Sequence, residues 1–441
     1  MQSTSPHTSQ WPMLGALSLA LAAWPSVGLA SGAAAPQESM VLLLTILASI
    51  GGAYLLTHFI VDRLQRKLLF VSGVEYILLG VLLGASSGVL SDVDSLAPVV
   101  AVGTGWIGLL QGVGLSGQRI RTLPRWAGRL ALVELVVVGG GVGLGGWLML
   151  TLGLGAEPAD AHLPAAILGL AAAAGSTTST GLLGRRFPQL AESGDTLALL
   201  DGVARLTQTF AILAFGVLLC IFHPDVPGMD PSPVAAEWLL LMLGLGVVLG
   251  GLFRLLVSAE STENHRFMAM VGIICFATGA AFFLDLSALA VNLVLGVVLA
   301  QGARGPELHQ TLTRTLGPVV LMLLLLAGVL WQPVPWVSGV VLALSIVALR
   351  AGLKLLSGML SAAGTPLRGD LGRGTMSQGA VSVAIALSCR LVYDGPLVDL
   401  VFTAILVSVV IAEAAGPRLL KGLLVDAGEL RQDLDLSPQE A

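Results

Sequence analysis

Long apolar segments separated by short polar connections fill most of the chain between residues 40 and 420. A transmembrane helix needs about 20 apolar residues, and these segments lack the alternation of apolar and polar residues typical of membrane β-strands. The pattern therefore predicts an all-α polytopic membrane protein with about 13 transmembrane helices. The predicted spans are 40–60, 68–90, 95–115, 128–153, 162–183, 195–222, 235–257, 267–284, 286–302, 312–331, 335–361, 374–393 and 397–420.

The first 35 residues form a separate region. Residues 11–30 are apolar and end in Gly28-Leu-Ala30, which is typical of a signal-peptide core with a cleavage site near Ala30, although no Lys or Arg precedes it. We therefore predict a signal peptide in residues 1–35, with an extra membrane helix as the alternative. Residues 36–425 are predicted to form the membrane domain and residues 426–441 a short cytoplasmic tail.

The connections between the predicted spans alternate between basic and acidic. Because cytoplasmic connections are enriched in Lys and Arg, this alternation predicts a multi-pass protein of a bacterial-type inner membrane with a cytoplasmic C-terminus. The acidic connections carry Asp92, Asp94, Glu157, Asp160, Asp225, Asp230, Asp394 and Asp399. Only Arg390 lies near the acidic side. The basic residues of the other side are Arg63, Arg66, Lys67, Arg119, Arg121, Arg125, Arg129, Arg185, Arg186, Arg266, Arg304, Arg314, Arg368, Arg373, Arg418, Lys421 and Arg431.

The composition argues against a soluble domain and against several other classes of protein. The chain is 55% hydrophobic and 11% charged, whereas soluble domains carry roughly 25% charged residues. The net charge is −5 without a long charged block, so we expect no nucleic-acid partner. The three cysteines lie apart in apolar runs, which predicts neither a disulfide framework nor a metal site. We find no nucleotide-binding loop or nucleophile constellation, and we expect no cofactor and no enzymatic chemistry.

Two predicted spans carry polar, glycine-interrupted stretches. In the span 162–183, Gly175 precedes a run of five hydroxyl residues, and the span 374–393 begins with Gly374 and contains Ser377, Gln378 and Gly379. Matching breaks in two halves of a chain are typical of transporters built from inverted repeats. The alternatives are a continuous helix with packed hydroxyls and a flexible loop. The five hydroxyl residues are Ser176, Thr177, Thr178, Ser179 and Thr180.

Ionisable residues inside spans are costly and therefore mark candidate sites. Asp201, Arg205 and Gln208 share one helical face, so Asp201 and Arg205 can pair within their own helix. Arg350 and Lys354 also share a face and need a counter-charge, for which Asp201, Glu134 and Glu413 all remain candidates. Thr207, Gln208 and Thr209 offer neutral oxygens. The ionisable residues within spans are Glu75, Glu134, Asp201, Arg205, Arg254, Arg350, Lys354 and Glu413.

Four motifs together carry a family resemblance. They are Val74-Glu-Tyr-Ile-Leu-Leu-Gly80-Val-Leu-Leu-Gly84, Ile107-Gly-Leu-Leu-Gln-Gly112, Leu286-Ser-Ala-Leu-Ala-Val-Asn292-Leu-Val-Leu-Gly296, and the stretch from Arg373 to Leu387. By their order and spacing, residues 40–430 resemble the monovalent cation:proton antiporter superfamily, nearest to its Kef-type potassium-efflux branch. The resemblance implies two inverted repeats with crossed discontinuous helices, a homodimer in a lipid bilayer, and a monovalent cation (Na⁺ or K⁺) and protons as substrates.

One stretch of the chain departs from the family's sequence pattern. In the family, the first broken helix faces an acidic motif whose carboxylate binds the cation and protons in turn. Here Gln208-Thr209 stands where that carboxylate belongs. The family's basic residue corresponds to Lys354 or Arg350.

Three hypotheses follow, because Gln and Thr do not titrate whereas a buried carboxylate can. The first is a cation:proton antiporter with a relocated carboxylate, Asp201 first and then Glu134 or Glu413. The second is an anion transporter on the same fold, which the positive ends of broken helices and the nearby basic residues favour. The third is a non-transporting membrane scaffold or sensor.

Overall fold

The computed structural model describes residues 73–86, 93–155, 162–178, 194–224, 233–259, 263–302 and 304–430. Within these ranges the chain forms helices, turns and irregular connections, without a strand. The elements are α4 (Glu75–Ser86), α5 (Val93–Val113), α6 (Gly117–Arg121), α7 (Ala127–Glu134), the π-helical turn η2 (Leu135–Gly139), α8 (Gly140–Leu148), the π-helical turn η3 (Met149–Gly153), α9 (His162–Gly175), α11 (Asp195–Ile221), α12 (Ala235–Ala259), α13 (Glu263–Phe283), α14 (Ala288–Ala300), α15 (Gly305–Val329), α16 (Trp336–Ala362), the 3₁₀ turn η5 (Leu371–Arg373), α17 (Ala380–Val392) and α18 (Pro396–Asp426).

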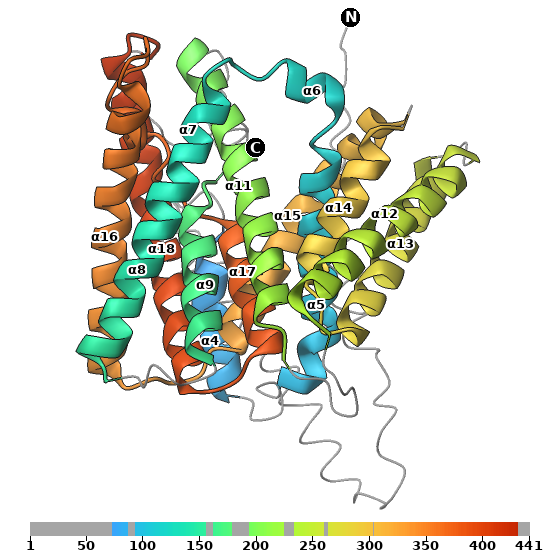
Figure 1. Cartoon of the computed structure of the whole chain (residues 1–441), viewed down its shortest axis with the longest axis horizontal. Helices are drawn as coiled ribbons and strands as arrows, with labels where there is room; N and C mark the ends of the chain where they lie inside the picture. Colours follow the sequence, from blue (N-terminus) through green and yellow to red (C-terminus); the bar gives the residue numbers. More distant parts are fainter. Residues whose placement is uncertain are drawn as a thin grey trace, which may run out of the picture. The chain divides into compact units, whose positions relative to one another are not determined.

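Twelve of the thirteen predicted spans coincide with these helices. Among the described residues, seven helical stretches are long and apolar enough to cross a membrane, and four shorter helices are also apolar. The predicted all-α polytopic fold is therefore confirmed (Figure 1). The predicted span 40–60, the predicted signal peptide 1–35, Ser179, Thr180 and residues 431–441 lie outside the described residues.

The helices α15 and α18 extend beyond their predicted limits. The helix α15 begins at Gly305 rather than at residue 312, because Pro306 lies in its first turn, where a missing N–H costs nothing. The helix α18 continues past residue 420 to Asp426, because its last turns bury Leu420, Leu423 and Leu424 on one face.

Two helices break where the sequence predicts. The helix α9 ends at Gly175 and residues 176–178 continue without helical structure; we call these the first interrupted segment. Residues 374–379 form the second interrupted segment, which precedes α17. The two segments cross, since the Thr178 N–H donates to the Ser377 carbonyl at 3.1 Å. The described part of the predicted crossed discontinuous helices is therefore present, and residues 179–193 lie outside the described residues.

Closely packed glycines show how the two repeats meet. The first repeat contains α4, α5, α7–η3, α9 and α11, and the second contains α14, α15, α16, α17 and α18. A Cβ on Gly80 of α4 would lie 2.8 Å from Gly328 Cα of α15, and a Cβ on Gly112 of α5 would lie 2.8 Å from Gly296 Cα of α14. The helix α4 of the first repeat thus packs backbone-to-backbone on α15 of the second, and α5 packs likewise on α14, as small residues allow in lipid.

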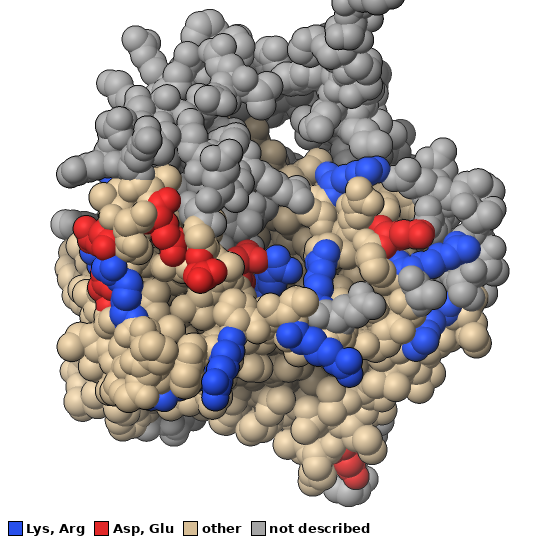
Figure 2. All heavy atoms as spheres, turned by 90° about the horizontal axis from the view of Figure 1, so that it is seen from above, with Lys and Arg blue, Asp and Glu red and all other residues tan. Residues whose placement is uncertain are grey.

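Several helix ends of the repeats converge at one end of the bundle. Arg129 at the start of α7 donates to the Ala363 carbonyl after α16 at 2.7 Å. Arg373 pairs with Asp426 at the end of α18 at 2.6 Å. Figure 2 shows Lys and Arg side chains spread over one face of the molecule, interspersed with Asp and Glu. Figure 1 shows α7, α16 and α18 together on one side of the view, and α12 and α13 on the other.

Candidate functional site

Glu134 lies on the buried face of α7. Ala127, Leu130, Ala131 and Glu134 follow one another at helical spacing and are all 0% exposed. The π-helical turn η2 begins at the next residue, Leu135. Such turns inside α-helices occur frequently at functional sites. The buried face of α7 therefore places the Glu134 carboxylate in the protein interior, directly before the π-helical turn η2.

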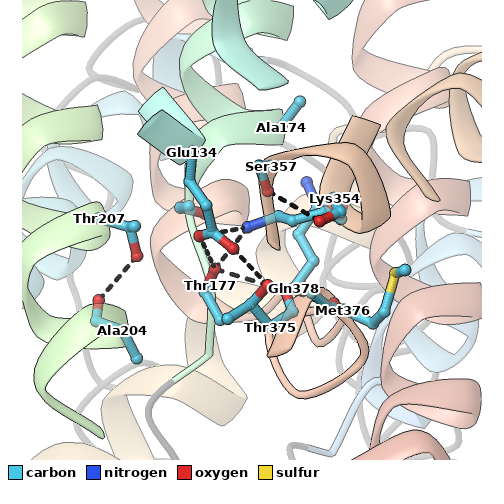
Figure 3. A network of polar contacts seen from close by, with 12 residues as sticks. Glu134, Ala174, Thr177, Ala204, Thr207, Lys354, Ser357, Thr375, Met376 and Gln378 are labelled. Carbon is cyan, nitrogen blue, oxygen red and sulfur yellow. Dashed lines mark hydrogen bonds and ion pairs between the residues drawn. The ribbon is translucent and has the colours of Figure 1, made fainter. Parts of the chain in front are cut away.

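The Glu134 carboxylate forms an ion pair with Lys354 of α16. The distance between Lys354 Nζ and Glu134 Oε2 is 3.0 Å, and both side chains are 0% exposed. Figure 3 shows the two side chains directed toward each other. Removing one partner of a buried ion pair typically costs about 3–5 kcal/mol, because the other charge is left uncompensated. Among the three carboxylates that the sequence offered as partners, Glu134 is the one that binds Lys354.

Hydroxyl groups from both interrupted segments complete this cluster (Figure 3). Lys354 Nζ donates to Thr177 Oγ1 at 2.6 Å, and Thr177 Oγ1 lies 3.4 Å from Glu134 Oε2. The Thr375 hydroxyl donates to the other carboxylate oxygen, Glu134 Oε1. Thr375 was absent from the predicted site residues, although it lies in the same polar, glycine-interrupted stretch as Ser377. The pair therefore lies where the two segments cross.

Arg350, one helical turn before Lys354, binds backbone carbonyls at the same crossing. Its guanidinium donates to the carbonyls of Ala174 at 3.1 Å, Ser176 at 3.2 Å and Met376 at 2.7 Å. A cation at this position compensates the partial negative charge of the α9 C-terminus. Arg350 thus joins both interrupted segments through carbonyl oxygens, which the sequence reasoning did not foresee.

The residues of the expected acidic motif are neutral and hydrogen-bonded. Gln208 Nε2 donates to the Thr177 carbonyl at 2.6 Å, and Gln208 Oε1 accepts from Gln111 of α5 at 2.6 Å. Thr207 and Thr209 donate to carbonyls of their own helix, at 3.0 and 2.8 Å. Gln208 therefore reaches the first interrupted segment as an amide.

Asp201 lies elsewhere on α11. Its carboxylate accepts from Arg205 Nε at 2.8 Å and from Arg205 Nη2 at 2.5 Å, within one helix. The two side chains are 22% and 39% exposed, in contrast to the fully buried Glu134 and Lys354. The predicted pairing of Asp201 with Arg205 is confirmed. The described hydrogen bonds of Asp201 do not extend to the interrupted segments.

A second buried carboxylate touches the crossing from α18. Glu413 is 1% exposed, and its Oε1 accepts from the Thr178 hydroxyl at 2.7 Å. The second interrupted segment is held by Gln378, whose Nε2 donates to the Ala173 carbonyl at 3.1 Å and whose Oε1 accepts from Ser408 at 2.8 Å. Ser176 and Ser382 share a further hydrogen bond. The hydroxyl residues of both predicted breaks that the structure describes are thus brought together.

Comparison with known proteins gives one kind of match. No protein-family model and no curated protein sequence matches the chain. Forty-one chains of solved structures do match. One is the sodium proton antiporter MjNhaP1 from Methanocaldococcus jannaschii at pH 8, with a TM-score of 0.58 and 14% identity over 86% of this chain and 99% of that one. At this identity the likeness shows a shared fold, which is the antiporter fold expected from the sequence.

Proposed function

We propose that the chain is a secondary transporter that exchanges a monovalent cation, Na⁺ or K⁺, for protons. The observation that carries this proposal is the fully buried Glu134–Lys354 pair at the crossing of the two interrupted segments. An exchanger needs a group whose charge differs between its two loads, and Gln208 and Thr209 cannot provide one. The Glu134–Lys354 pair provides one, because Lys354 can release its proton while Glu134 supplies the carboxylate in place of the family's acidic motif.

The geometry suggests how one site serves two ions. In the proton-loaded form, the Lys354 ammonium occupies the oxygens of Glu134 and Thr177. An incoming monovalent cation competes for the same oxygens together with the Thr375 hydroxyl. When Lys354 gives up its proton, the cation replaces that positive charge beside Glu134. The charge at the crossing is then equal in the two forms, so one proton leaves for each cation bound.

The anion-transport alternative gains no support from these contacts. The Lys354 ammonium binds Glu134 and Thr177, and the Arg350 guanidinium binds three carbonyls. The positively charged groups of Lys354 and Arg350 therefore already donate their hydrogen bonds to oxygen atoms of the protein, where an anion would need them.

The remaining expectations from the sequence belong to the same proposal. The protein is a homodimer in a bacterial-type inner membrane with its C-terminus in the cytoplasm, and it is nearest to the Kef-type branch. It carries no enzymatic activity. The Arg129, Arg368 and Arg373 side chains, which join helix ends at one end of the bundle, then mark the cytoplasmic face.

Proton flux in proteoliposomes tests the proposal. A pH-sensitive dye reports proton movement when NaCl or KCl is added outside, and choline chloride controls for ionic strength. We expect flux in wild type, its loss in Glu134→Gln, and partial retention in Glu134→Asp. Asp201→Asn is the matched control, since Asp201 is a carboxylate paired within its own helix. Flux that survives in Glu134→Gln but disappears in Asp201→Asn would contradict the assignment.

A further inference from the structure

The inverted repeats make α11 and α18 equivalent helices. Each is the last helix of its repeat, and each comes after the broken helix of that repeat, α9 or α17, in the order of the described helices. Gln208 of α11 and Glu413 of α18 both bind the first interrupted segment, Gln208 at the Thr177 carbonyl and Glu413 at the Thr178 hydroxyl. The last helices of both repeats therefore bind the first interrupted segment, α11 through an amide and α18 through a carboxylate.

Glu413 is built into the crossing through close backbone packing. A Cβ on Gly379, the residue before α17, would lie 3.3 Å from Glu413 Oε1. One turn further along α18, a Cβ on Gly416 would collide with the Ser377 side chain. Glycine at both positions brings α18 against the second interrupted segment. The carboxylate also lies beside the N-terminus of α17, which carries a partial positive charge.

Glu413 and Glu134 contact neighbouring residues of the first interrupted segment. Thr177 and Thr178 are consecutive, but their hydroxyl groups contact different carboxylates. Thr177 Oγ1 contacts Glu134 and Lys354, whereas Thr178 Oγ1 contacts Glu413. One carboxylate from each repeat thus flanks the same short stretch of backbone.

We propose that Glu413 and Thr178 form a second binding position for a monovalent cation, separate from the Glu134–Lys354 pair. This inference rests on the proposed cation exchange and adds a second site to it. The carboxylate from α18 and the hydroxyl from the first interrupted segment are hard oxygen donors of the kind that alkali cations take. Ionised carboxylates buried in a membrane interior typically mark ion pathways. The Glu134–Lys354 pair carries the proton, and Glu413 determines how tightly the cation is held and which cation is preferred.

Direct cation binding to the purified full-length protein tests the proposal. Thermal unfolding in detergent is titrated with LiCl, NaCl, KCl and RbCl at constant ionic strength, and the cation-dependent shift gives an apparent Kd. We expect Glu413→Gln to weaken this Kd by about tenfold or more, because the ligand loses its charge. Thr403→Val, on the same helix, is the matched control, since Thr403 bonds to the Asp399 carbonyl and to Trp331.

Two further variants cover the case in which Glu413→Gln does not fold. Thr178→Ser keeps the hydroxyl that bonds Glu413 and is expected to keep the affinity, whereas Thr178→Val removes it and is expected to weaken binding. Glu413→Asp is expected to change the order of affinities among the four cations, which a purely structural role would leave unchanged.

The outcomes separate this inference from the proposed exchange. Wild-type affinity and selectivity in the Glu413 and Thr178 variants would overturn the second position, even where proteoliposomes show exchange. The absence of any cation-dependent shift in wild type would overturn it as well. Cation binding that depends on Glu413, in a protein without cation-driven proton flux, would support the second position and reject the exchange.

Discussion

The buried Glu134–Lys354 pair predicts two single variants with opposite pH dependence. In Glu134→Gln, Lys354 loses the carboxylate 3.0 Å from its ammonium, in a position with 0% exposure. In Lys354→Met, Glu134 loses its cation in the same surroundings. Each remaining charge can then be neutralised, by release of a proton from Lys354 or by uptake of one by Glu134. The cost of neutralisation sets an upper limit on the part of the destabilisation that comes from the uncompensated charge.

The limits follow from ordinary pKa values and about 1.36 kcal/mol per pH unit. At pH 7, neutralising a lysine of ordinary pKa about 10.4 costs about 4.6 kcal/mol, and this falls to about 1.9 kcal/mol at pH 9. Neutralising a glutamate of ordinary pKa about 4.3 costs about 3.7 kcal/mol at pH 7 and about 1.6 kcal/mol at pH 5.5. The values at pH 7 agree with the usual cost of breaking a buried pair, about 3–5 kcal/mol.

The signs follow from proton linkage. Folded Glu134→Gln binds fewer protons than its unfolded form, so its deficit relative to wild type shrinks as the pH rises. Folded Lys354→Met binds more protons than its unfolded form, so its deficit shrinks as the pH falls. The double variant leaves neither charge behind, and we expect it to be more stable than either single variant, with no pH dependence from this site.

Thermal unfolding in detergent between pH 5.5 and pH 9 measures these differences. Tryptophan fluorescence is a suitable signal, since the chain contains 8 tryptophans. The slope of each variant is compared with that of wild type in the same buffers. Parallel slopes for the two single variants, or a double variant less stable than both, would refute the buried ion pair.

Three further predictions concern packing, backbone binding and the surface. Gly112→Val is expected to destabilise by more than about 3 kcal/mol and to reduce the yield of folded protein in membranes, because its Cβ would meet the backbone of α14; Gly317→Ala, with open space around it, is the control. Arg350→Lys is expected to lower the unfolding temperature, because each backbone carbonyl left without a donor lowers the free energy of unfolding by about 1–3 kcal/mol. The hydrogen bond from Arg368 holds the pKa of Asp370 below its ordinary value. The contribution of Asp370 to the free energy of unfolding is therefore present above about pH 3.9 and is lost as the pH falls through the lowered pKa. We expect the free energies of unfolding of Asp370→Asn and wild type to differ by less than about 1 kcal/mol at neutral pH and to converge in acid.

The fold could be predicted because each element is encoded locally. Apolar length places the spans, and the polar run after Gly175 ends α9 where expected. The glycine-rich stretch before α17 likewise marks the second break. Helix ends inside polar connections were less predictable, since the start of α15 depends on Pro306 and the end of α18 on burial by neighbouring helices.

The partners within the site could not be derived from the sequence. Spacing along α16 shows that Arg350 and Lys354 share a face, but it gives no information about which helix approaches that face. The structure shows α7 there, with Glu134 on its buried stripe, and it shows Arg350 bound to carbonyls. Asp201 ranked first in the sequence because it lies near the expected motif, whereas contact with the crossing depends on tertiary packing.

The π-helical turn after Glu134 has a consequence for sequence comparison. Such a turn contains one residue more than an α-helical turn over the same rise. Deleting one residue from Leu135–Gly139 would restore α-helical geometry and leave α7 and α8 with the faces they now bury. In this stretch, a single-residue gap in an alignment leaves the packing of both helices unchanged. Within a regular α-helix, the same gap rotates all the residues after it by about 100° about the helix axis. Relatives of this chain that lack the turn should therefore align with one gap directly after the position of Glu134.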